Sequence, residues 1–98
     1  MVKYQLTNLA VQGLSDIWNY TFDNWSEQKA DNYHEELVDT FQSIANKPNT
    51  GRKFEGVRKE LFGIKVNRHI VFYRIKTNDL VEITRILHER MDLKNRLK

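Results

Sequence analysis

Apolar residues in the first half of the chain recur at intervals of three and four positions. The first series is Val11, Leu14, Trp18, Phe22 and Trp25, and the second is Ala30, Tyr33, Leu37, Phe41 and Ile44. This spacing places each series on one face of an α-helix. Asn8 and Ser26 are predicted N-caps, and Pro48 prevents the second helix from continuing. We therefore predict a helical hairpin over residues about 9–46.

The second half of the chain is rich in β-branched and aromatic residues, interrupted by short polar turns. Such runs predict strands at residues 61–66, 69–76 and 80–88, and alternation predicts another at residues 3–7. Because the turns between the last three strands are short, these strands are antiparallel. Gly63 is expected to mark a bulge, and residues 46–56 are expected to form a loop.

The predicted element order is β-α-α-β-β-β, which indicates an α+β fold. We expect the helical hairpin to pack on one face of a mainly antiparallel sheet and the other face to stay open to water or to a partner. A chain of 98 residues is expected to form a single domain, residues 1–98. The side chains expected to be largely buried are Trp18, Phe22, Tyr33, Leu37, Phe41, Phe72 and Ile83.

Charge divides the chain into two unlike halves. Residues 1–50 hold three lysines against seven acidic residues, a net charge of −4. Residues 51–98 hold thirteen basic residues against six acidic ones, a net charge of +7. The basic half predicts an acidic partner, which is nucleic acid, a nucleoprotein or an acidic protein segment. The alternative is a solvated basic surface.

Several classes of protein are excluded by what the chain lacks. The chain has no cysteine, which excludes disulfides and thiolate metal sites. No run of about 18 apolar residues and no signal-peptide pattern is present, so we expect a cytoplasmic protein with no membrane partner. His34, His69 and His88 are dispersed and suggest no metal site, and no phosphate loop or nucleophile elbow is visible. We therefore expect no cofactor.

Two arginines in the last strands are candidates for function. Arg85 has the same side-chain parity as Val81, Ile83 and Leu87, and Arg74 has the parity of Ile70 and Phe72. An arginine on a mostly apolar strand face needs an ionic partner or a position at an edge. Both interpretations, a structural ion pair and contact with a partner molecule, remain open at this point.

Three segments carry a resemblance to a known family. They are the triplet Phe72-Tyr73-Arg74, the run Arg85-Ile86-Leu87-His88 with Arg90-Met91-Asp92, and the proline- and glycine-containing stretch 46–52. With these segments the chain resembles the ParE toxins of bacterial toxin–antitoxin pairs, within the RelE/ParE superfamily. The order of the upstream elements agrees, so the resemblance covers nearly the whole chain.

The resemblance implies a toxin that inhibits DNA gyrase by binding and needs no catalytic residues of its own. It also implies a ParD-like antitoxin, whose disordered C-terminal segment folds onto the toxin in a hetero-oligomer. The residues that we expect to contact the gyrase–DNA target are Arg74, Arg85, His88, Arg90, Lys94, Arg96 and Lys98.

Two alternatives use the same fold. RelE-like relatives are ribosome-dependent messenger RNA ribonucleases that use a basic cluster and a C-terminal tyrosine or histidine. This chain has no tyrosine after Tyr73, but it retains His88 with the arginines. The second alternative is a non-toxic binding module. In that case Leu9, Ile17 and Val38 either line a groove for an amphipathic helix or belong to a broader core face.

Overall fold

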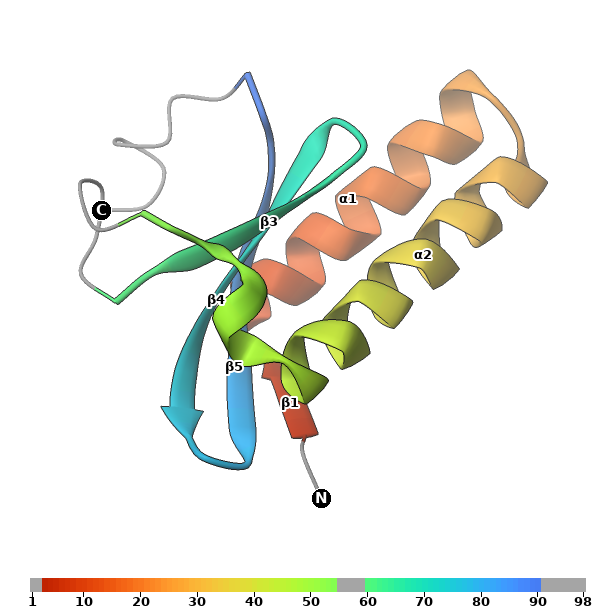
Figure 1. The fold of residues 1–98 in the computed structure, drawn as a ribbon. Helices are drawn as coiled ribbons and strands as arrows, with labels where there is room; N and C mark the ends of the chain where they lie inside the picture. Colours follow the sequence, from red (N-terminus) through yellow and green to blue (C-terminus); the bar gives the residue numbers. More distant parts are fainter. Residues whose placement is uncertain (1–2, 55–59, 91–98) are drawn as a thin grey trace.

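The computed structural model of the protein describes residues 3–54 and 60–90 and has two helices on a five-stranded sheet (Figure 1). The elements are β1 (Lys3–Leu6), α1 (Asn8–Asn24), α2 (Glu27–Asn46), the 3₁₀ helix η1 (Pro48–Thr50), β2 (Arg52–Lys53), β3 (Phe62–Val66), β4 (His69–Thr77) and β5 (Leu80–His88). The strand order is β1-β5-β4-β3-β2, with β1 parallel to β5 and the other pairs antiparallel. The predicted α+β architecture is confirmed.

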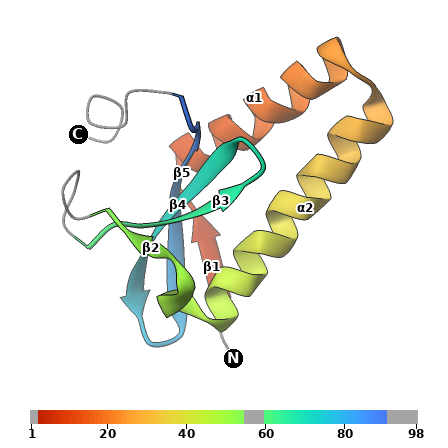
Figure 2. The ribbon, with the colours of Figure 1, turned by 45° about the horizontal axis from the view of Figure 1, so that its top comes forward.

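The helices form an antiparallel pair on one side of the sheet (Figures 1 and 2). The end at which α1 joins α2 projects beyond the strands in both views. Ser26 caps α2 as predicted, and its hydroxyl accepts the N–H of Lys29 at 3.1 Å. The cap of α1 is Thr7 and not Asn8, because the hydroxyl of Thr7 accepts the N–H of Ala10 at 3.1 Å.

The core between helices and sheet confirms the prediction for α2. Ala30, Leu37, Phe41 and Ile44 are all at most 1% exposed, and Ile83 of the sheet is fully buried in the same core. Phe72 is also fully buried as predicted, but in a second cluster on the other face of the sheet. Tyr33 is only half-buried, because its ring lies at the margin of the core beside His69.

The series predicted for the core face of α1 is largely wrong. Val11, Phe22 and Trp25 are 50%, 45% and 68% exposed, and Trp18 is half-buried. The buried residues of α1 are Ala10 and Ile17, on the neighbouring face of the helix. The outer end of the hairpin has no strand beneath it (Figures 1 and 2), so its aromatic side chains find no core to enter.

Gly13 explains why the face of α1 that carries small side chains packs against the sheet. A Cβ atom at this position would lie 3.0 Å from the backbone oxygen of Ile86 in β5. The helix therefore approaches the strand closely where it has no side chain, and that packing offsets the roughly 1 kcal/mol by which glycine weakens a helix relative to alanine.

The predicted loop at residues 46–56 contains two short elements, η1 and β2. The phenol of Tyr73 holds this segment, because it donates to the backbone oxygen of Pro48 at 2.7 Å and accepts the N–H of Gly51 at 2.9 Å. Burial raises the pKa of Tyr73, against the smaller opposing effect of the Gly51 hydrogen bond. The long-range contact with β4 therefore orders residues that look irregular in sequence.

Gly63 does not form the predicted bulge. It pairs regularly with Phe72 of β4 and with Arg52 of β2. A Cβ atom here would lie 2.7 Å from a ring carbon of Phe54, so the glycine makes room for that ring. The register shifts occur instead between β4 and β5, beside Phe72 and Tyr73 and again near Ile75.

We predict that Leu37→Ala lowers the free energy of unfolding by about 2–5 kcal/mol, because it leaves a cavity at a fully buried site. The matched control is Leu9→Ala, the same substitution at a side chain that is 56% exposed, with an expected change within about 0.5 kcal/mol. Urea denaturation followed by circular dichroism measures both. Equal losses in the two variants would contradict the burial described here.

Candidate partner-binding face

A bulge in β5 decides which side of the sheet Arg85 occupies. Phe72 pairs with Arg85 and Tyr73 pairs with Ile83, so one step along β4 corresponds to two steps along β5. The extra residue is Thr84, and it reverses the alternation of side chains beyond it. The prediction that Arg85 shares a face with Val81 and Ile83 is therefore wrong, whereas the prediction that it shares a face with Leu87 is correct. Arg85 lies with Phe72, on the face away from the helices.

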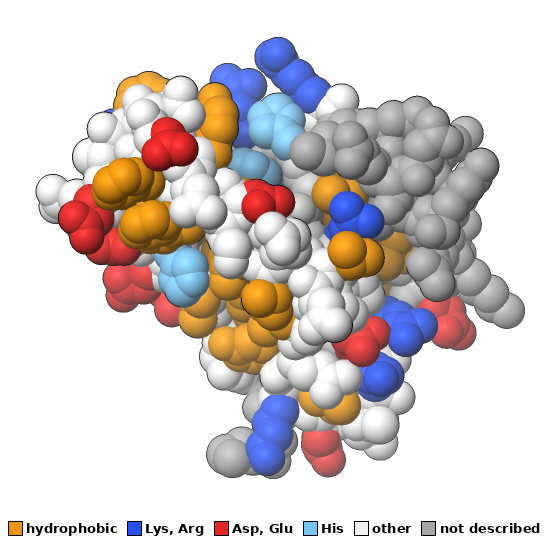
Figure 3. All heavy atoms as spheres, turned by 180° about the vertical axis from the view of Figure 1, so that it is seen from behind, with side chains coloured by type: hydrophobic (Ala, Val, Ile, Leu, Met, Phe, Trp, Pro, Cys, Tyr) orange, Lys and Arg blue, Asp and Glu red, His pale blue; other side chains and the backbone are white. Residues whose placement is uncertain are grey.

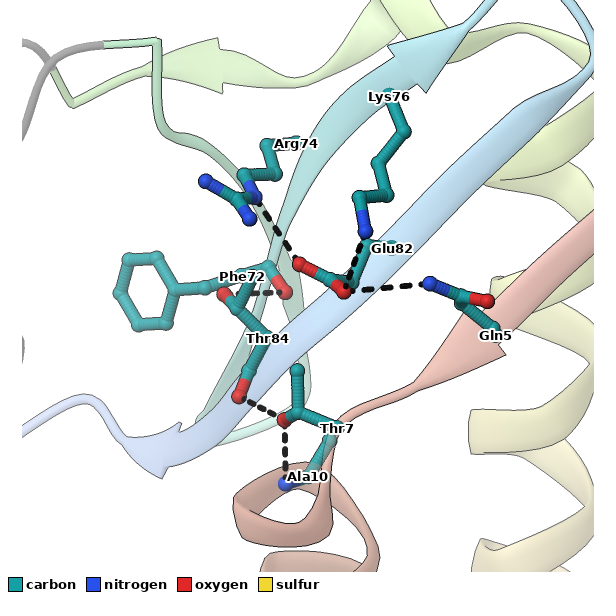
Figure 4. Close-up of polar contacts among 8 residues, drawn as sticks. All are labelled: Gln5, Thr7, Ala10, Phe72, Arg74, Lys76, Glu82 and Thr84. Atoms are coloured by element: carbon teal, nitrogen blue, oxygen red, sulfur yellow. Dashed lines mark hydrogen bonds and ion pairs between the residues drawn. The ribbon is translucent and has the colours of Figure 1, made fainter.

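Hydrogen bonds satisfy the backbone around this bulge (Figure 4). The hydroxyl of Thr84 donates to the backbone oxygen of Phe72 at 3.2 Å. The hydroxyl of Thr7 donates to the backbone oxygen of Thr84 at 2.7 Å, while it also accepts the N–H of Ala10. A carbonyl that a bulge removes from the ladder needs another donor. One hydroxyl therefore joins the start of α1 to the bulge.

Arg74 lies on the same face as Arg85 and forms an ion pair (Figure 4). Its Nε lies 3.0 Å from Oε1 of Glu82, while Nζ of Lys76 lies 3.4 Å and Nε2 of Gln5 3.2 Å from Oε2. Burial raises the pKa of Glu82, but these hydrogen bonds outweigh burial and hold the pKa below its usual value. Two cations share one carboxylate, so the cluster keeps a net positive charge.

The face away from the helices is basic along most of its width. Strand pairing and ion pairing place five basic residues there: Arg52, Lys65, Arg74, Lys76 and Arg85. Three of them, Arg52, Lys65 and Lys76, are absent from the residues singled out in the sequence. The sequence does indicate the position of Lys76, because this residue alternates with Phe72 and Arg74. The position of Arg52 depends on strand β2, which the sequence did not predict. We name this surface the basic face.

The basic face is not simply open, as the sequence suggested. A second apolar cluster lies on it, formed by Leu61, Phe72 and Leu87 with the half-buried Phe54 and Ile70 packed against them. The Phe54 and Phe72 rings meet edge to face at 5.2 Å, and the Arg52 guanidinium lies 5.3 Å from the Phe54 ring. The surface thus combines apolar side chains with surrounding positive charge.

The other candidate residues do not join Arg74 and Arg85. His88 pairs across the strands with His69, whose ring contacts Tyr33 of α2, so His88 lies on the helix side of the sheet. Arg90 follows the end of β5 and is exposed. Lys94, Arg96 and Lys98 lie outside the described residues.

The candidate groove residues are also divided. Ile17 is buried, and Val38 packs against the main core, so both belong to the core face. Leu9 is exposed.

Within residues 3–54 and 60–90, no three His, Asp or Glu side chains converge as a metal site. None of the helices described is both long and apolar enough to cross a membrane.

Comparisons with known proteins agree with the resemblance in sequence. The model of a family described as the ParE toxin of the type II toxin–antitoxin system parDE matches residues 4–93. The chain is 35% identical over 97 residues to Toxin ParE1 of Caulobacter vibrioides, covering 99% of both chains. It is 30% identical over 95 residues to Toxin ParE1 of Mycobacterium tuberculosis, covering 97% of both.

Two solved structures share the fold. A structure of the chromosomal ParDE toxin–antitoxin system of P. aeruginosa aligns with a TM-score of 0.77 and 17% identity, covering 90% of this chain and 96% of that one. The toxin–antitoxin complex RelBE2 of Mycobacterium tuberculosis aligns with a TM-score of 0.65 and 16% identity, covering 89% and 96%. At these identities the likeness concerns the fold.

We predict that Thr7→Ala lowers the free energy of unfolding by about 1–3 kcal/mol, because it removes a helix cap and leaves the Thr84 carbonyl without its donor. Thr7→Ser keeps the hydroxyl and is expected to retain most of the stability. Thermal or urea unfolding compares the two. If serine were no better than alanine, the shared hydroxyl would not be what stabilises the bulge.

Proposed function

The chain belongs to the ParE toxin family of type II toxin–antitoxin systems, and on this premise we propose that it inhibits DNA gyrase by binding and is neutralised by a ParD-like antitoxin. The toxin stabilises the cleaved gyrase–DNA complex without catalysing a reaction itself. A cytoplasmic location follows from this proposal, because gyrase and its DNA are cytoplasmic in bacteria.

The observation that supports binding over catalysis is the separation of His88 from the two arginines. A ribonuclease requires its proton-transfer group and its phosphate-stabilising groups within reach of one phosphodiester. Arg74 and Arg85 lie on the basic face, whereas His88 lies on the helix side of the same sheet. The combination that would serve RelE-like cleavage is therefore divided by the sheet.

We assign the gyrase–DNA contact to basic groups at the end of β5 and beyond it. Arg85 and Arg90 provide the first of these charges, and Lys94, Arg96 and Lys98 continue them in sequence. Arg74 and His88 are secondary candidates, because Arg74 pairs with Glu82, well before the end of β5, and His88 lies on the other side of the sheet. Positive charge of this kind favours a surface that carries DNA phosphates.

The antitoxin segment in this proposal docks on the basic face. Phe54 and Ile70 are half-buried and offer apolar contacts, and the surrounding cations favour acidic side chains. A disordered segment that orders there buries its own apolar residues on folding. Because this surface includes Arg74 and Arg85, the bound segment excludes the target from the same residues.

Charge on the remaining surface also favours the sheet over the helices as the site of an acidic segment. The seven acidic residues of the first half lie in α1 and α2. On the side opposite to that of Figure 1, patches of hydrophobic side chains are interspersed with Asp and Glu (Figure 3). An acidic segment would meet like charges there, which oppose binding.

We predict that a chain ending at Arg90 loses gyrase inhibition by at least about tenfold, because it lacks Lys94, Arg96 and Lys98. It keeps Glu89, which pairs with Lys65 and holds the end of β5. A full-length variant in which these three residues are changed to Gln separates the loss of charge from the loss of chain length. Arg74→Ala alone is expected to weaken inhibition by about fivefold or less, as for other exposed ion pairs.

The assay is purified gyrase with supercoiled DNA, run beside a translating ribosome with a reporter message. Inhibited supercoiling with accumulation of cleaved DNA is the expected result, and circular dichroism verifies the fold of each variant. Cleavage of the message with gyrase unaffected would overturn the proposal and assign His88 to acid–base catalysis.

We predict that the ParD-like antitoxin encoded beside this protein binds with a dissociation constant below about 1 μM and a decrease in heat capacity. Ile70→Asp is expected to weaken binding strongly, because it places a charge within the apolar part of the basic face. Tyr20→Asp makes the same change at an exposed residue of α1 and is expected to leave affinity nearly unchanged. Calorimetry at several temperatures measures these quantities. Equal weakening by both variants would place the antitoxin elsewhere.

A further inference from the structure

Two histidines that lie 19 positions apart in sequence meet at the end of the sheet. His69 of β4 and His88 of β5 are cross-strand partners, and their rings meet edge to face with centroids 5.4 Å apart. Histidine side chains gather near the top of Figure 3. The phenol of Tyr33 from α2 lies 2.9 Å from Nδ1 of His69. The expectation that the histidines are dispersed is therefore wrong for this pair.

The hydrogen bonds determine the tautomer of each neutral ring. The phenol of Tyr33 has one proton, which it donates to the backbone oxygen of Val66 at 2.9 Å. Nδ1 of His69 must then donate to the phenol oxygen, because two acceptors would otherwise face each other. Nδ1 of His88 accepts the backbone N–H of Arg90 at 3.1 Å, so neutral His88 carries its proton on Nε2.

Protonation affects the two rings differently. His69 already donates through Nδ1, so a second proton on Nε2 leaves its contact with Tyr33 intact. Protonated His88 carries an N–H on both nitrogens, and the N–H at Nδ1 would face the N–H of Arg90. That hydrogen bond must break when His88 is charged.

The environment of His69 disfavours positive charge on its ring. Burial lowers the pKa of His69, and the neighbouring His88 lowers it further, against the opposing effect of Glu89. A histidine whose pKa in the folded state lies below its ordinary value of 6.5 stabilises the fold above about pH 6.5. That contribution is lost as the pH falls towards the lowered pKa.

Charged groups beside the two histidines also hold the residue after β5, Glu89, against β3 and the turn that follows it. Nζ of Lys65 lies 2.8 Å and Nη1 of Arg68 3.9 Å from the carboxylate of Glu89, whose backbone N–H donates to the Arg68 oxygen at 2.8 Å. The hydrogen bond from Lys65 holds the pKa of Glu89 below its usual value, so these contacts of Glu89, which we call the clasp, persist at mildly acidic pH.

The helices place few charged groups near His69 and His88. Glu36 of α2 lies 3.3 Å from the side-chain amide of Asn67, in the turn before His69. On α1, which meets β5 through Gly13, the nearest acidic residue in sequence is Asp16, and its carboxylate accepts a hydrogen bond from Gln12 at 2.8 Å. Both carboxylates thus have polar partners of their own.

We propose that His88, packed against His69, is a proton-operated latch, in which neutral His88 holds the backbone of Arg90 and protonated His88 releases it. The clasp at Glu89 keeps the end of β5 in place, so among the described residues the change is confined to the hydrogen bond of Arg90. An effect on gyrase binding through Lys94, Arg96 and Lys98 rests on the proposed function, whereas the latch itself does not.

The test is a pH titration of the isolated protein by NMR between pH 7.5 and 5.5, with no gyrase present. The ring protons of His88 and the backbone amide of Arg90 are expected to shift with the same midpoint. Exchange of the Arg90 amide with solvent, corrected for the intrinsic effect of pH, is expected to rise about tenfold as its hydrogen bond is lost. The amide of Glu89 is expected to stay protected.

Substitutions separate the latch from general effects of pH. His88→Asn keeps an oxygen acceptor near the position of Nδ1 but cannot titrate, so the Arg90 amide is expected to become independent of pH. His34→Asn, a change at an exposed residue of α2, is expected to preserve the wild-type titration. An Arg90 amide that does not respond in the wild-type protein, or that responds equally in His88→Asn, would overturn the proposal.

Discussion

The hydroxyl of Thr7 is the constraint on which the arrangement of this protein depends. It caps α1 through the N–H of Ala10 and satisfies the carbonyl of Thr84 at the bulge in β5. The bulge places Arg85 on the basic face and, further along the strand, His88 on the helix side. Without the extra residue the alternation of β5 would exchange these positions, because a slip of one residue moves every later side chain to the other face.

The sheet therefore separates two chemically different surfaces. On one side lie the main core and two acidic helices, and on the other a small apolar cluster surrounded by cations. This separation divides the residues that a nuclease would need to combine, and it leaves a surface suited to an acidic partner. Of the two roles considered for Arg74 from the sequence, the structure shows the ion pair. The ion pair with Glu82 is real, and Lys76 leaves the cluster positively charged.

The spacing of apolar residues predicts burial correctly only where the helix face has a surface to pack against. For α2 the apolar series met the sheet and was buried as expected, with Leu37 and Phe41 at its centre. For α1 the spacing predicts the larger apolar residues in the core, but the close approach at Gly13 packs the face with small side chains on β5. Burial requires a partner surface, and the outer end of the hairpin has none. Phe22 and Trp25 are exposed for that reason, although their spacing is helical.

The sequence by itself determined the helices, the three C-terminal strands, the contrast in charge and the resemblance to ParE toxins, because each depends on local periodicity, composition or short motifs. Only the tertiary structure decided the side of the sheet that Arg85 occupies, the strand at Arg52, and the meeting of His69 with His88. These features depend on a bulge and on contacts between residues far apart in the chain. The energy of such contacts comes from packing and from shared hydrogen bonds, and neither is encoded in the spacing of residues along one strand.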